Sequence, residues 1–418
     1  MATFANAQQY DDTAFIRNWL KQQIDSISDP GMYGRGYVNK GRDKAADYLS
    51  RQFKALNLKY PGKKRSYFQQ YSFPVNTFPG KMNFAFDGKP LAAGEDFWID
   101  AGSNGIFDTS MQVEVKDLAS IATTEEWDVF AKSFQPKGRA YILLNADSLC
   151  KKLGIRKRYL TYILPKGCFI LGQKGKFNWT VECDHAEATV LYVRDELLKN
   201  VPSKASANIA SKWFSSAKSK NLIGVLPGAI ADSYLVVSAH FDHLGMMGIN
   251  TVFPGASDNA SGTAMLLYLA KYFSTHPHKY SIIFIAFSGE EAGLLGSEYY
   301  IRHPKLPLNR IKFLTNIDIM GDATEGITVV NATEYPKQFD FLKEINSRNH
   351  YLPKIVSRGK ASNSDHYYFS ELGIPSIFIY TNGGKGYYHD IFDKKEEVTL
   401  MNIPQNARLL IDFLRDYQ

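Results

Sequence analysis

Five segments of this chain place an imidazole or a carboxylate at the end of an apolar run or in the loop that follows one. These are the side chains that hold metal ions in many hydrolytic enzymes. Taken singly, each has a simpler explanation as a solvated rim residue, a turn residue or a helix cap. Taken together, they predict a metal centre formed by His240 in LVVSAHFDHLG, Asp258 in PGASDNASG, Glu290 and Glu291 in IIFIAFSGEEAG, Asp318 in FLTNIDIMGD and His389 in GYYHDIFD.

The donor types in these segments favour Zn²⁺, with Mn²⁺ or Co²⁺ as substitutes. Two histidines and three carboxylates can hold two ions about 3.5–4 Å apart if one carboxylate bridges them. Adjacent residues after a strand can face different directions, so one of Glu290 and Glu291 can bind metal while the other faces a metal-bound water. A free carboxylate in that position is a natural general base.

Asp242 lies two residues after His240. On an extended backbone the two side chains face the same side. A metal-binding imidazole usually donates its second N–H to a carboxylate or a carbonyl. We therefore expect Asp242 to orient His240.

Other polar residues near these motifs receive structural or supporting roles. Two histidines are already better placed to bind metal, so any further histidine is expected to be structural. Two acids close to His389 could support it, and an Asp-His pair is expected to open a helix. These residues are His243, Asp365, His366, Asp390 and Asp393.

Three competing catalytic motifs are not found. HExxH is absent, which excludes the helix-based zinc proteases, and GxSxG is absent, which leaves a serine nucleophile unsupported. The glycine-rich segment 383–386 lacks the spacing of a phosphate-binding loop. A flexible loop that carries His389 is the better interpretation.

From about residue 220, apolar runs alternate with helical stretches, which is typical of an α/β fold. The runs predict strands at 222–226, 234–239, 281–287, 313–319, 327–331 and 374–380. Helical spacing predicts helices at 261–273, 294–301, 338–347, 366–372 and 403–417. Near-continuous apolar strands suit a mostly parallel sheet covered on both faces. The fold class is therefore a three-layer α/β sandwich.

This fold gives the metal-binding candidates a common location. Ligands of open α/β sheets bind beyond the carboxyl ends of the strands. His240 and Glu290 each follow a predicted strand, Asp318 lies at the end of one, Asp258 lies in a loop that opens a helix, and His389 lies in the loop after 374–380. All five segments can therefore converge on one rim of the sheet.

The segment from about 66 to 210 differs from the rest. It is rich in aromatic residues, glycine and short alternating runs, which predicts an irregular, β-rich module with one or two helices. Helical spacing predicts helices in the segment 12–57, and we assign this segment to the same domain as the residues after 210. We expect a discontinuous catalytic domain, 1–80 and 211–418, and an inserted domain, 81–210.

Composition and charge argue against nucleic acids and membranes as partners. The net charge is +7, but basic and acidic residues are interleaved and no nucleic-acid-binding motif accompanies them. No apolar stretch is long enough for a membrane span. The segment Ala5-Asn6-Ala7 resembles the end of a signal peptide, so we expect a secreted or periplasmic protein. Of three cysteines, Cys168 and Cys183 are the candidates for a disulfide.

The motifs resemble, in order, those of the di-zinc aminopeptidase family that includes bacterial leucyl aminopeptidases, peptidase family M28. The similar segments are AHFDHLG, PGASDNASG, SGEEAGLLGS, NIDIMG, SDHYYFSELGIPSIFIY and YYHDIFD, over about 220–393. GRGYVNKGRDKAADYLSRQFKALNL is similar to the family's N-terminal helices, and GRAYILLNADS faintly resembles a protease-associated domain.

The resemblance implies a role for each residue. His240 and Asp318 would bind one zinc ion, and Glu291 and His389 the second. Asp258 would bridge the two ions. Glu290 would be the general base that activates the bridging water and then protonates the leaving amine, and Asp242 would orient His240.

The function expected from the residues and the resemblance is a zinc-dependent exopeptidase that removes N-terminal residues from peptides. One alternative is a carboxypeptidase or dipeptidase on the same scaffold, for which Arg358 or Lys360 could bind a substrate carboxylate. A second is a glutaminyl cyclase, an acyltransferase that works with one zinc ion. A third is a metal-free binding module, although such a module would have lost ligands that this chain retains.

Overall fold

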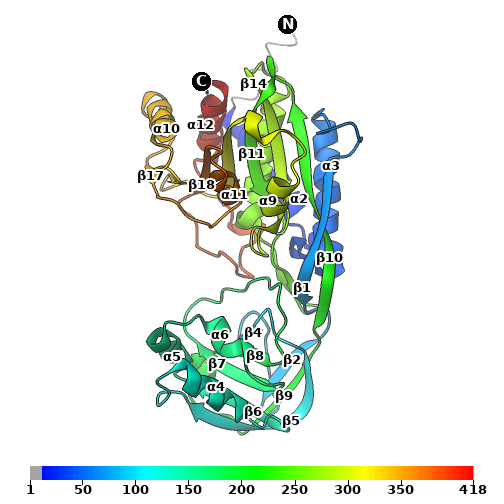
Figure 1. The fold of residues 1–418 in the computed structure, drawn as a ribbon, viewed down its shortest axis with the longest axis vertical. Helices are drawn as coiled ribbons and strands as arrows, with labels where there is room; N and C mark the ends of the chain where they lie inside the picture. Colours follow the sequence, from blue (N-terminus) through cyan, green and yellow to red (C-terminus); the bar gives the residue numbers. More distant parts are fainter. Residues whose placement is uncertain (1–11, 418) are drawn as a thin grey trace.

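Two β-sheets of eight strands each organise the protein. The computed structural model describes residues 12–417, so the segment Ala5-Asn6-Ala7 lies outside the described residues and export stays a prediction. Figure 1 shows an upper body built on one sheet and a lower body built on the other. Two long strands, β1 (Phe68–Thr77) and β10 (Lys212–Leu226), pair antiparallel and run from one body to the other.

The upper sheet has the strand order β1-β10-β14-β11-β15-β18-β16-β17. Its central strands β14, β11, β15 and β18 pair in parallel. The pairs β1–β10, β10–β14 and β16–β18 are antiparallel, and β16–β17 is parallel. The parallel centre brings the carboxyl ends of its strands to one rim. The remaining strands are β11 (Ile230–His240), β14 (Tyr280–Phe287), β15 (Ile311–Asp318), β16 (Ile327–Val330), β17 (Ile355–Ser357) and β18 (Ser376–Thr381).

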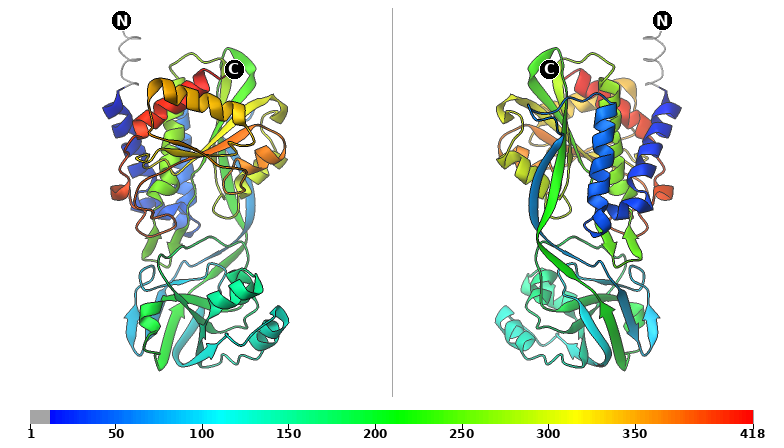
Figure 2. Two further views of the ribbon diagram at one scale, coloured as in Figure 1. Left: turned by 90° about the vertical axis from the view of Figure 1, so that its left-hand side faces the viewer. Right: turned by 90° about the vertical axis from the view of Figure 1, so that its right-hand side faces the viewer.

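Helices cover both faces of the upper sheet, as Figure 2 shows. One face carries α2 (Thr13–Ile27), α3 (Gly41–Ala55), α8 (Gly262–Phe273), α10 (Pro336–Asn349) and α12 (Ile403–Arg415). The other carries α9 (Leu295–Arg302) and α11 (Tyr367–Glu371). Every residue of α8 except Lys271 is buried, because this helix packs between the sheet and α2 and α12. The predicted three-layer α/β sandwich is confirmed.

The predicted helices and strands after residue 220 coincide with observed ones, apart from small differences at their ends. The strand expected at 222–226 is the end of β10, which starts at Lys212. The participation of β1 in the upper sheet is not indicated by the sequence, because much of β1 and the first half of β10 is partly exposed and lacks an apolar run. Short 3-10 helices and a two-stranded sheet complete the upper body: Pro30–Arg35, Val38–Lys40, Leu308–Arg310, Lys395–Glu397, β12 (Gly245–Met247) and β13 (Thr251–Phe253).

The lower sheet has the order β3-β2-β9-β5-β6-β7-β8-β4. Its strands are β2 (Met82–Phe86), β3 (Lys89–Leu91), β4 (Phe97–Ile99), β5 (Ile106–Asp117), β6 (Arg139–Leu144), β7 (Cys168–Gln173), β8 (Thr189–Arg194) and β9 (Lys204–Ile209). The expectation of one or two helices here is wrong. Amphipathic segments between the strands form four short helices: α4 (Thr124–Lys132), α5 (Ala146–Leu153), α6 (Lys157–Tyr162) and α7 (Asp195–Leu198).

The apolar core of the lower body extends to the upper one. It is built around large buried side chains such as Trp127, Phe97 and Phe169, and it also includes Met247 and Phe253 from the β12–β13 hairpin. The two bodies therefore share a packed interface. The domain limits at 80 and 211 stay a prediction.

The disulfide considered between Cys168 and Cys183 is not formed, and Cys150 is unpaired too. Cys168 lies in β7, inside the lower core, whereas Cys183 faces the upper body, where its thiol lies 3.5 Å from the Ala292 carbonyl oxygen. Between residues 12 and 417, no helix is both long and apolar enough to cross a membrane.

Candidate metal centre

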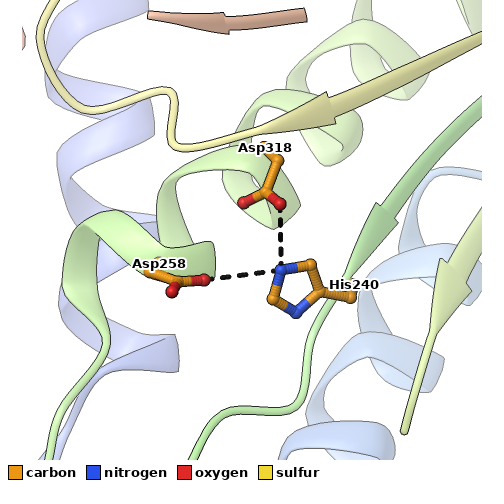
Figure 3. A group of neighbouring side chains, drawn as sticks. All are labelled: His240, Asp258 and Asp318. Carbon is orange, nitrogen blue, oxygen red and sulfur yellow. Dashed lines mark hydrogen bonds and ion pairs between the residues drawn. The ribbon is translucent and has the colours of Figure 1, made fainter. Parts of the chain in front are cut away.

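Three of the predicted ligands meet at the carboxyl ends of the parallel strands. His240 is the last residue of β11 and Asp318 the last of β15, and these two strands are neighbours. The Nε2 atom of His240 lies 3.2 Å from Oδ2 of Asp318 and 3.4 Å from Oδ1 of Asp258. Figure 3 shows the three side chains pointing toward one another. All three are buried.

Asp258 comes from the segment Ala256–Ser261 that precedes α8, where its own backbone is extended rather than helical (φ −106°, ψ 102°). The next residue caps the helix: Oδ1 of Asn259 accepts a hydrogen bond of 2.8 Å from the Gly262 N–H. The Asp258 side chain is therefore not used as a cap and faces the centre. Its Oδ2 atom lies 3.3 Å from Nε2 of His389, so its two oxygens face two different imidazoles.

The adjacent glutamates diverge after the end of β14. Oε2 of Glu291 lies 3.0 Å from Nε2 of His389, and Oε1 lies 2.7 Å from Nδ1 of His243. Oε2 of Glu290 lies on the other side of the centre, 4.0 Å from Nε2 of His240. One glutamate thus joins the His389 side of the centre, and the other stands beside the His240 side.

Different surroundings give the two glutamates opposite pKa shifts. Burial raises the pKa of Glu290 well above its ordinary value, and the charge of Glu291 raises it further against the opposing effect of His240. Burial also acts to raise the pKa of Glu291, but the nearby His389 and His243 outweigh it and lower that pKa to about 2. Glu291 is therefore an anion held among imidazoles, whereas the net effect of its surroundings on Glu290 is to raise its pKa.

The donor set fits two divalent cations. Three buried polar atoms of the predicted ligands have no hydrogen-bond partner: Oδ2 of Asp258, Oδ1 of Asp318 and Nε2 of His389. Leaving such atoms without a partner costs about 1–3 kcal/mol each, and cations would satisfy them. Among the described residues, one group of donor atoms joins His240, Asp258 and Asp318, and a second joins His243, Asp258 and Glu291, so the two share Asp258. A third group joins His240, Glu290 and Glu291. The sharing of Asp258 by the first two groups is what a bridging carboxylate requires.

Asp242 contacts His240 through its main chain. Nδ1 of His240 is 3.2 Å from the carbonyl oxygen of Asp242, a shorter distance than the 3.8 Å to its Oδ1. The Asp242 carboxylate instead accepts a hydrogen bond of 3.4 Å from the Glu290 N–H. Asp242 therefore contacts two predicted site residues, one with its backbone and one with its side chain.

Asp393 supports Asp258 rather than His389. Its carboxylate accepts hydrogen bonds from the N–H groups of Ser257 (2.8 Å) and Asp258 (3.0 Å). The Asp390 carboxylate accepts a local hydrogen bond of 3.2 Å from the Phe392 N–H.

The Asp-His pair expected to open a helix does lie directly before α11, and both residues are buried. His366 makes no side-chain cap, and burial lowers its pKa to about 4. Asp365 accepts a hydrogen bond of 2.5 Å from the Ser297 hydroxyl. Burial raises the pKa of Asp365 to about 7, although His240 opposes this shift. Asp365 thus belongs to the surroundings of the centre without joining its donor clusters.

Sequence reasoning missed two residues that contact the centre. His243 was interpreted as structural, yet its imidazole is fully buried and hydrogen-bonded to Glu291. Its position in AHFDHLG, three residues after His240, was the available signal. The second is Arg35, which lies in the segment GRGYVNKGRDKAADYLSRQFKALNL but was given no role. This fully buried side chain donates to the carbonyl oxygens of Phe241 (2.7 Å), Pro254 (2.7 Å), Gly255 (2.7 Å) and Asp258 (3.1 Å).

Arg35 thus ties the segment after β11 to the segment that carries Asp258. We expect Arg35→Met to lower the free energy of unfolding by about 3 kcal/mol, because several buried carbonyls would lose a charged donor. Arg17→Met, a change at an exposed position of α2, is the matched control and should leave it nearly unchanged. Urea denaturation of both variants measures the difference, and equal stabilities would contradict this role.

Comparison with known proteins matches residues 221–414 to the model of peptidase family M28. Aminopeptidase YwaD of Bacillus subtilis is 30% identical over 233 residues, which are 53% of this chain and 50% of that protein. Leucine aminopeptidase 1 of Leptosphaeria maculans is 27% identical over 237 residues, 52% of this chain and 60% of that protein. The chain thus spans between about half and three-fifths of the length of these curated relatives.

Solved structures share the fold of both bodies. The zinc aminopeptidase BSAP from Bacillus subtilis superposes with a TM-score of 0.69 at 20% identity, over 96% of this chain and 94% of that one. The peptidase M28 precursor from Shewanella amazonensis gives 0.68 at 15% identity, over 99% of this chain and 95% of that one. The family match thus assigns residues 221–414 to peptidase family M28, and the solved structures show that the whole chain shares the fold of these proteins.

Proposed function

We propose that this protein is a zinc-dependent aminopeptidase that removes single residues from the N-termini of peptides. The proposed ligands of one zinc ion are His240 and Asp318, and those of the second are Glu291 and His389. Asp258 is the proposed bridge. The family match and the two relatives that are themselves named aminopeptidases support this class of activity.

The observation that carries the proposal is the position of the Asp258 carboxylate. Its Oδ1 and Oδ2 atoms lie 3.4 Å from Nε2 of His240 and 3.3 Å from Nε2 of His389. A carboxylate between two imidazoles suits a pair of cations better than a single one. Each imidazole also has one of the other proposed ligand acids within 3.2 Å, Asp318 and Glu291 respectively.

Bound zinc would polarise the scissile carbonyl and acidify an attacking water. The chain's own contribution to proton transfer is assigned to Glu290, which stands beside the His240 side of the centre. Its carboxylate would take the proton from the water and return it to the leaving amine. Asp242 would hold the Glu290 backbone and the His240 ring in place through the two contacts described above.

The alternative carboxypeptidase or dipeptidase activity needs a free cation near the centre. Arg358 donates to the Tyr380 hydroxyl at 3.4 Å, and Lys360 forms an ion pair with Glu371. Both cations are exposed and have partners, so no observation favours this alternative. The experiment is to assay metal-replete protein with aminoacyl anilides and with N-blocked peptides. Release of residues from N-blocked peptides only would overturn the aminopeptidase proposal.

Metal removal gives an independent prediction. Dialysis against a chelator should abolish peptidase activity, and added Zn²⁺ should restore it with two ions bound per chain. The expected cause is the loss of both carbonyl polarisation and water activation. Metal analysis during reconstitution provides the measurement. Full peptidase activity at one ion per chain would contradict the two-ion centre.

A further inference from the structure

A loop of the lower body reaches the metal centre of the upper one. It lies between the end of β7 at Gln173 and the start of β8 at Thr189. Within it, the Trp179 N–H donates to the His389 carbonyl at 3.3 Å, and the Cys183 thiol contacts the Ala292 carbonyl at 3.5 Å. Ala292 directly follows the two adjacent glutamates, so the loop touches two of the segments that form the centre.

The contact with His389 fixes its imidazole. Nδ1 of His389 lies 2.9 Å from the carbonyl oxygen of Trp179. A carbonyl oxygen can only accept, so Nδ1 is the donor to Trp179 and Nε2 is the nitrogen left to bind a metal ion. That Nε2 atom is the one that faces Glu291 and Asp258. A main-chain group of the lower body therefore sets both the direction and the tautomer of this ring.

The Trp179 carbonyl is itself rigidly placed. The Trp179 side chain is 6% exposed, and its Nε1–H donates to the Ile99 carbonyl at 2.8 Å. Its ring stacks on Phe253 with centroids 4.7 Å apart and an angle of 20° between the planes. The indole thus binds the lower body at β4 and the upper body at the β12–β13 hairpin.

A second contact holds the loop that carries His389. The Lys176 ammonium donates to the carbonyl oxygens of Gly386 (2.6 Å) and Tyr388. Gly383, Gly384 and Gly386 all have positive φ angles, and glycine loses more conformational freedom on ordering than any other residue. This glycine-rich loop therefore depends on external contacts such as Lys176 for a defined position.

We propose that the 174–188 loop of the lower body is a positioning element of the metal centre, which acts through the Trp179 carbonyl and the Lys176 ammonium on His389. The lower body would then help to hold the geometry of the proposed metal site formed by Glu291 and His389. This inference rests on the proposed two-ion function. Groups that orient a metal-binding histidine typically contribute 10–100-fold in metal affinity or activity.

The test compares Lys176→Met with Lys174→Met, a matched change at an exposed position of the same loop. Competition titration of the apoprotein with Zn²⁺ should show about 10–100-fold weaker binding of one ion in Lys176→Met. The other ion should bind as in the wild type, and so should both ions in Lys174→Met. Equal affinities in all three proteins would overturn the role of Lys176.

A second variant tests the tautomer. In wild-type protein, ¹⁵N NMR of labelled histidines should show the His389 Nδ1–H retained with and without zinc, assigned by its loss in His389→Gln. Trp179→Phe should weaken this signature and the affinity for one ion, whereas Trp213→Phe, at a partly exposed position of β10, should not. Absence of the His389 Nδ1–H from zinc-bound wild-type protein would overturn the proposal.

The outcomes separate this inference from the function itself. Unchanged metal affinity in Lys176→Met and Trp179→Phe, with wild-type aminopeptidase activity present, would remove the positioning role and leave the proposed function intact. Failure of the wild type to bind two ions or to release N-terminal residues would instead remove the proposed function.

Discussion

Glu290→Gln should bind two zinc ions with wild-type affinity and lose about 10²–10⁴-fold in turnover, the range that a general base contributes. The substitution keeps the size of the side chain and removes its ability to accept a proton. Oε2 of Glu290 lies 4.0 Å from Nε2 of His240, in a donor group with His240 and Glu291 but outside the one with Asp258 and Asp318. Because Glu290 is not among the proposed ligands, metal retention is expected. Metal analysis and steady-state kinetics on an aminoacyl anilide measure the two quantities.

Glu298→Gln, on the surface pair with Arg302 in α9, is the control and should change neither quantity. Two results would contradict the assignment in different ways. Full turnover in Glu290→Gln would show that another group moves the proton. Loss of a metal ion would show that Glu290 is a ligand.

Asp258→Asn should lose the ability to hold two ions together. An amide offers one oxygen where the bridge needs two, and each oxygen of Asp258 faces a different imidazole. At zinc concentrations that saturate the wild type, the variant should bind no more than one ion, and peptidase activity should fall below that of Glu290→Gln. Titration calorimetry and metal analysis give the stoichiometry.

The matched control for this change is Asp232→Asn, near the opposite end of β11, where the carboxylate pairs with Arg310 on the surface. It should bind two ions and remain active. If Asp258→Asn also bound two ions tightly, the bridge would have to be another carboxylate of the centre, and Glu291 would be the first to examine.

Much of the fold followed from the sequence because its strands are apolar throughout. Buried parallel strands carry a strong signal, and the predicted strands at 234–239 and 313–319 ended close to His240 and Asp318 as the observed strands do. Knowing that ligands bind at the carboxyl ends of such strands was sufficient to place the candidate centre. The lower body was less predictable, since its four short helices lack long periodic patterns.

The contacts that support the centre could not be predicted for a different reason. Arg35 and the 174–188 loop act on main-chain carbonyls or through them, and a carbonyl oxygen is the same in every residue type. No spacing in the sequence distinguishes Trp179 as a partner of His389. His243 lies in the recognised motif AHFDHLG. Its role as a partner of Glu291 depends on the direction of the Glu291 side chain, which only the three-dimensional structure gives.

The wide separation of these contacts along the chain has a kinetic consequence. Trp179 and His389 are 210 positions apart, and Arg35 reaches Asp258 across 223. Contacts between distant residues form slowly, because long loops must close before any interaction rewards them. The centre is therefore complete only when the segment around Arg35, the lower body and the loop that carries His389 have all packed into place. A partly folded chain then lacks a complete catalytic centre. During refolding, activity should therefore return only at the last step of folding.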